Sequence, residues 1–83
     1  MNQQEKTTEE LKDWLQGQGV ASEPYGRGCL LIGSFGAAAA MVKAPELLSR
    51  AGVPYGVTRG GYMVTAYDIG QMAACGWKPP AAA

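Results

Sequence analysis

Apolar side chains near the start of the chain follow a helical spacing, three and four residues apart, at Leu11, Trp14 and Leu15. This spacing places them on one side of a helix. Thr7 and Glu10 have the spacing of a capping box, which predicts where the helix begins, and the glycines that follow predict where it ends. The pattern therefore predicts a first helix over residues 8–17, after a disordered N-terminus over residues 1–6.

Four consecutive apolar residues bounded by glycines, residues 29–32, predict a buried strand. The segment before it, residues 21–28, is rich in turn-forming residues and is predicted to be a turn. After the strand, an alanine-rich stretch predicts a helix over residues 35–43. Pro45 is expected to interrupt that helix, so a second short helix is expected over residues 45–51.

The second half of the chain carries a hairpin pattern. Two runs of strand-forming residues, 55–58 and 62–67, flank a glycine-containing link over residues 59–61. Asp68 has a side chain that caps helices well, and the residues after it predict a last helix over residues 69–75.

Together these elements predict an α+β fold with a small antiparallel sheet of about three strands and three or four short helices. One domain over residues 7–78 is expected, with a flexible tail over residues 79–83, because a chain of 83 residues supports one small core. The strand at residues 29–32 aligns with residues 63–66 at a constant offset, which predicts two related α-β-α halves. The alternative is a chance alignment, since glycine, alanine and proline are abundant.

Composition excludes several kinds of chemistry. The chain has no histidine, and its seven basic and seven acidic residues give a formal net charge of zero. Without histidine there is no imidazole ligand for zinc and no side chain that titrates near neutrality. Cys29 and Cys75 form no C-x-x-C pair and are expected to be buried and inert. We therefore expect no catalytic residues, no metal and no cofactor, and a protein that is not an enzyme.

The apolar stretch after the first turn region, residues 29–42, is too short to cross a bilayer and contains glycines. The polar N-terminus has no signal-peptide pattern. These features predict a cytoplasmic protein without membrane association.

Aromatic residues and glycine-flanked arginines gather in the predicted turns. The residues expected to bind a partner are Tyr25, Arg27, Tyr55, Arg59, Tyr62 and Trp77. Tyrosine, tryptophan and arginine dominate the energetics of protein interfaces. The sequence therefore predicts a small non-enzymatic protein-binding domain that also forms a homodimer. The specific form considered is a phage or mobile-element inhibitor of a host defence complex, such as an anti-CRISPR protein.

A nucleic-acid-binding regulator is the alternative, because residues 24–83 carry five basic and two acidic side chains. Its contacts would come from Arg27, Lys43, Arg50 and Arg59. Residues 47–59 are also similar to the turn of helix-turn-helix regulators, which would add Thr58 to the contacts. Glycines in the second half of that motif disfavour a recognition helix.

Overall fold

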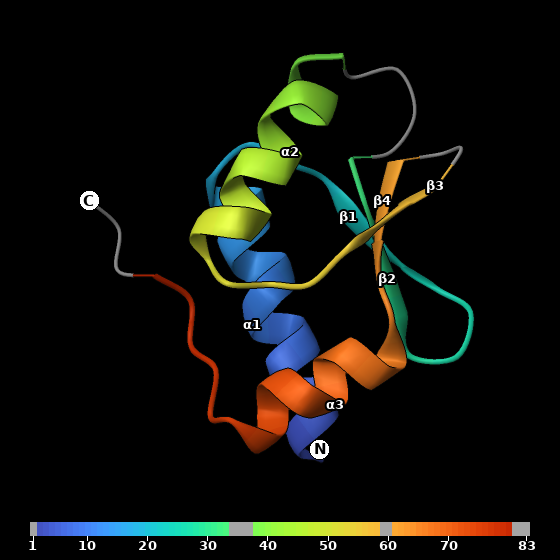
Figure 1. The fold of residues 1–83 in the computed structure, drawn as a ribbon, viewed down its shortest axis with the longest axis vertical. Helices are drawn as coiled ribbons and strands as arrows, with labels where there is room; N and C mark the ends of the chain where they lie inside the picture. The colour runs from blue at the N-terminus through green and yellow to red at the C-terminus, as the bar shows by residue number, and fades with distance from the viewer. Residues whose placement is uncertain (1, 34–37, 59–60, 81–83) are drawn as a thin grey trace.

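The computed structural model describes residues 2–33, 38–58 and 61–80. In the helix that begins at residue 38, side chains are described from residue 42 onward. This part of the chain forms three helices and one four-stranded antiparallel sheet (Figure 1). In chain order the elements are α1 (Gln3–Gly17), β1 (Ser22–Tyr25), β2 (Cys29–Ile32), α2 (Ala38–Arg50), β3 (Gly56–Thr58), β4 (Gly61–Val64) and α3 (Ala66–Ala74). The predicted α+β class is confirmed, with one strand more than expected.

Helix α1 begins about one turn earlier than the sequence pattern predicted. The side chain of Asn2 accepts a hydrogen bond of 2.8 Å from the backbone N–H of Glu5 and so caps the helix. Thr7, the predicted cap, is instead a fully buried residue inside α1, so that prediction is wrong. Residues 3–6, which were expected to precede the domain, belong to α1.

All three helices end in the same way, with a left-handed glycine followed by an apolar residue. The three pairs are Gly19-Val20, Gly52-Val53 and Gly76-Trp77. In each pair the N–H of the apolar residue donates a 2.9 Å hydrogen bond to a carbonyl five residues earlier, on Leu15, Leu48 and Met72 respectively. This is the Schellman arrangement, which also packs the apolar residue against the last turn of its own helix. The glycines therefore fix where the chain leaves each helix.

Helix α2 runs through Pro45 without a break, so the predicted division into two helices is wrong. Proline removes one helical hydrogen bond because it has no N–H, which costs about 3 kcal/mol in a helix interior. Ala44, Leu47 and Leu48 surround it on the buried side of α2 and hold the helix against the sheet. Residues 35–37 of the predicted helix lie outside the described residues.

Helix α3 begins before the predicted cap. The hydroxyl oxygen of Thr65 accepts a hydrogen bond of 3.1 Å from the backbone N–H of Asp68. Asp68 is therefore the third residue of α3, where its negative charge favours the helix N-terminus. The prediction that Asp68 caps the helix is wrong because Thr65 offers a cap one turn earlier.

The sheet has the strand order β1-β2-β4-β3. Two hairpins, β1–β2 and β3–β4, meet through the antiparallel pairing of β2 with β4, in which Leu31 lies opposite Met63. Strand β2 has the predicted bounds, whereas β1 lies in a segment predicted as a turn. In place of an α-β-α unit, each half consists of a helix followed by a hairpin. The predicted alignment with residues 63–66 is shifted, because β4 ends at Val64 and Thr65 caps α3.

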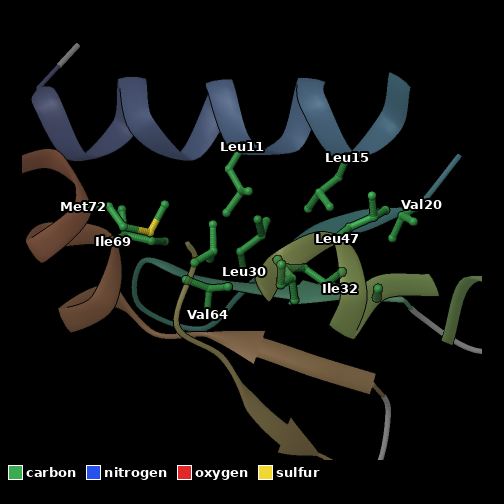
Figure 2. Packing of buried hydrophobic residues seen from close by; sticks show 12 residues of the cluster. Leu11, Leu15, Val20, Leu30, Ile32, Leu47, Val64, Ile69 and Met72 are labelled. Carbon is green, nitrogen blue, oxygen red and sulfur yellow. The ribbon is translucent and has the colours of Figure 1, made fainter. Parts of the chain in front are cut away.

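The core lies between the sheet and the helices. Leu30, Ile32 and Val64 point to one face of the sheet, and side chains from all three helices pack onto them (Figure 2). Helix α1 also runs against α3, and an ion pair of 3.3 Å joins Glu10 of α1 to Lys78 beyond α3. Strand alternation places Leu31 and Met63 on the opposite face.

Gly61 and Gly70 provide matched tests of this packing. Gly61 has φ +143°, and a Cβ there would overlap the backbone carbonyl oxygen of Ile32. Gly61→Ala should therefore lower the free energy of unfolding by about 3 kcal/mol or more. In Gly70→Ala the new Cβ would meet only the end of the flexible Gln4 side chain, at 2.7 Å. Better helix propensity should then raise stability by about 0.5 kcal/mol, as denaturant unfolding would show. Equal effects of the two substitutions would contradict the proposed packing.

Thr7 provides a second test, because its buried hydroxyl oxygen has no hydrogen-bond partner among the described residues. Thr7→Val keeps the shape and removes the unpaired hydroxyl, so it should raise the free energy of unfolding by about 1 kcal/mol. Thr8→Val is the control, since the Thr8 hydroxyl donates to the carbonyl of Gln4 at 2.9 Å. A thermal melt in which Thr7→Val is less stable than wild type would refute the assignment of an unpaired hydroxyl.

Candidate protein-binding site

The turn of the first hairpin holds one arginine between two glycines. Gly26 and Gly28 have φ of 66° and 76°, and the N–H of Gly28 donates a 3.0 Å hydrogen bond to the carbonyl of Gly26. The turn is also tied to α3, because a Cβ on Gly28 would lie 3.2 Å from the Cβ of Ala66. Arg27 is therefore presented at the tip of a tight turn whose backbone conformation favours glycine on both sides.

Arg27 is exposed and forms no hydrogen bond or ion pair with the described residues. The other two described arginine and lysine candidates, both on α2, have partners within the chain. Arg50 pairs with Glu46 at 2.9 Å, and the ammonium of Lys43 donates to the carbonyl of Gln18 at 2.8 Å. Of these three basic candidates, only Arg27 keeps all its donors available to another molecule.

Two exposed tyrosines lie at the same end of the molecule as Arg27. Tyr25 ends β1 and is 55% exposed, and Tyr67, in the first turn of α3, is 73% exposed. Tyr67 follows Ala66, and Ala66 lies close to Gly28 of the hairpin turn. We refer to Tyr25, Arg27 and Tyr67 as the hairpin-tip site. Sequence reasoning missed Tyr67 because it placed this residue in a strand, before the predicted start of the last helix.

The remaining predicted binding residues lie elsewhere. The rings of Tyr55 and Tyr62 form an edge-to-face pair, with centroids 5.5 Å apart and planes at 89°, and both pack against the core. The indole N–H of Trp77 donates to the carbonyl of Ala51 at 2.9 Å, and its ring also packs on the core. Arg59 lies outside the described residues. Of the six, the structure places Tyr25 and Arg27 together on the first hairpin, and a binding role for all six stays a prediction.

The segment that is similar to a helix-turn-helix motif does not form two helices. After α2, the chain leaves through Gly52 and Val53 and continues as strand β3. No recognition helix therefore follows α2 at residues 56–58, and Thr58 lies in the sheet. The structure gives this segment a place in the second hairpin instead.

A surface hollow of about 440 Å³ lies beside the hairpin-tip site. It is bounded by the beginning of α1, the first hairpin and the beginning of α3. Glu5 and Glu9, one helical turn apart on α1, line it together with Pro24 and Ala66. Ile69, which is almost completely buried, contributes to its floor. We call this feature the acidic hollow.

Reactive groups and metal ligands are dispersed over the described residues. Within residues 2–33, 38–58 and 61–80, no group of three or more cysteine, aspartate and glutamate side chains could hold a metal ion. Cys29 and Cys75 are free thiols, the first half-buried and the second exposed, so the predicted burial of Cys75 is wrong. None of the helices in this part of the chain is long and apolar enough to span a membrane.

Exposed Tyr25 and core-packed Tyr62 should differ in how much each contributes to the free energy of unfolding. Tyr62→Ala should lower the free energy of unfolding by about 2 kcal/mol, because its ring packs on Tyr55 and the core. Tyr25→Ala should change it by less than about 0.5 kcal/mol, because the side chain is largely exposed. Chemical denaturation of both variants measures the difference, and a larger loss for Tyr25→Ala would contradict this assignment.

Comparisons of the chain with protein-family models, with curated proteins and with solved structures find no match.

Proposed function

We propose that this chain is a small protein-binding domain whose binding surface is the hairpin-tip site. The observation that carries the proposal is the presentation of Arg27, without an intramolecular partner among the described residues, in a turn fixed by two glycines. Exposed Tyr25 and Tyr67 accompany it at the same end of the molecule.

These residue types favour a protein partner. Interface residues whose truncation costs about 2 kcal/mol or more are enriched in tyrosine and arginine. The turn around Arg27 has its own backbone hydrogen bond and lies close to Ala66, and an ordered turn loses little backbone entropy on binding. Binding through these three side chains needs no nucleophile, metal or cofactor.

Nucleic-acid binding is the second candidate, because tyrosine rings can stack on bases and Arg27 can contact phosphate. The described basic candidates for phosphate contact do not lie together on one surface element. Arg27 lies in the turn between β1 and β2, whereas Lys43 and Arg50 lie on a separate element, helix α2 (Figure 1). The arrangement therefore supports a protein partner better than a phosphate backbone.

A narrower expectation than protein binding in general is that the partner belongs to a host defence complex. An inhibitor of a host defence complex, encoded by a phage or mobile element, would need a compact binding surface of this kind. That expectation rests on composition and on the expected non-enzymatic, protein-binding role, and it stays a prediction.

Affinity capture from the native cell tests the proposal with three baits. These are the wild-type chain, the double variant Tyr25→Ala/Arg27→Ala, and Arg50→Ala as a control that removes one arginine elsewhere. A specific partner should be retained by the wild type and by Arg50→Ala and lost by the double variant, since only the latter changes the hairpin tip. Circular dichroism should show that all three baits are folded.

Salt dependence separates the two kinds of partner. Protein binding should change little between about 50 and 200 mM salt, whereas binding to phosphate should weaken by orders of magnitude. Retention of labelled oligonucleotides that follows the steep dependence would favour the nucleic-acid alternative. A partner that binds the double variant as tightly as wild type would refute the hairpin-tip site.

A further inference from the structure

The acidic hollow carries unbalanced negative charge. Glu5 and Glu9 form no ion pair with another described residue, whereas Glu10 on the same helix pairs with Lys78. Like charges one helical turn apart repel each other, and a cation placed between them would relieve this repulsion. The hollow also offers apolar surface from Pro24, Ala66 and Ile69. This combination suits a side chain with an aliphatic stem and a cationic end.

A side chain of that kind lies on the same surface. Arg27 is carried by the hairpin whose residues Pro24 and Gly28 line the hollow. It is exposed and has no partner among the described residues. One end of the molecule therefore carries both a protruding cation and a concave acidic surface.

In a two-fold dimer the same surface of both copies forms the interface, so any contact between two different residues occurs twice, once in each direction. We propose that a second copy of this chain occupies the acidic hollow, with Arg27 of each copy inserted between Glu5 and Glu9 of the other. The five N–H donors of a guanidinium suit two carboxylates better than a single ammonium does. This inference rests on the proposed function, because it uses the same hairpin tip to bind protein.

A charge-exchange experiment on the purified full chain tests this pairing by sedimentation at high micromolar concentration. The wild type should be dimeric. Arg27→Glu alone and Glu5→Lys/Glu9→Lys alone should be monomeric, because each places like charges opposite one another. An equimolar mixture of the two should be dimeric again. In the mixed dimer the new glutamate faces the new lysines, and the native Arg27 faces the native Glu5 and Glu9.

Two controls accompany the exchange. Asp13→Lys/Glu23→Lys makes the same change in charge at exposed positions that do not line the hollow, and it should leave the dimer intact. Glu5→Gln/Glu9→Gln is a milder variant in case lysine in the first turns disturbs α1. It should raise the dissociation constant of the dimer about tenfold. Circular dichroism of each variant checks that α1 is still formed.

Three results would overturn the inference. The first is a wild-type chain that stays monomeric, and the second is a mixture of variants that does not reassociate. The third is a dimer that survives Arg27→Glu but is lost in Val57→Lys, which would assign the contact to the exposed edge strand β3. A monomer whose hairpin tip still captures another protein would refute only this inference. A reciprocal dimer whose double variant Tyr25→Ala/Arg27→Ala loses no cellular partner would refute only the proposed function.

Discussion

The pairing of β2 with β4 is the interaction on which the rest of the fold depends. It joins the two hairpins into one sheet, and it places Leu30 directly opposite Val64 on the face that the helices cover. The close approach of Gly61 to the carbonyl of Ile32 lies at the end of this pairing. Without the β2–β4 contact, each half would be a helix and a two-stranded hairpin, and a hairpin alone is marginal in water.

The helices add what the short strands cannot supply. Strands of three or four residues bury few side chains, so most of the core comes from α1, α2 and α3. Each helix ends at a left-handed glycine that turns an apolar residue back toward the core, which sets the direction of the following segment. For α1 and α2 that segment leads into a hairpin. The position of the Arg27 turn against α3 thus follows from backbone geometry as well as from side-chain packing.

Much of the fold is encoded in local sequence patterns, and each sequence-based prediction that was wrong has a physical cause. Strand β2 could be predicted because four apolar residues in succession have few alternatives in a small domain. Strand β1 could not, because Pro24 and its exposed neighbours Glu23 and Tyr25 resemble a turn when β2 is not seen beside them. The continuity of α2 through Pro45 depends on tertiary burial of its neighbours, which local propensity does not include. At the candidate site, Tyr25 and Arg27 could be predicted because the arginine lies between glycines in a predicted turn, next to a tyrosine. Tyr67 is placed near them only by the close approach of Gly28 to Ala66.

The packing of α1 against α3 has a consequence for synthesis of the chain. Ribosomes release residues in order, so α1 emerges long before Ile69 and Met72, with which Leu11 shares a core. Its apolar side therefore has only part of its native cover until both hairpins and α3 have emerged. The favourable cap from Asn2 and the Schellman end at Gly19 are local and can form during this interval. Completion of the core must wait until α3 is free to pack against α1, which makes tertiary folding of this domain late relative to the synthesis of α1.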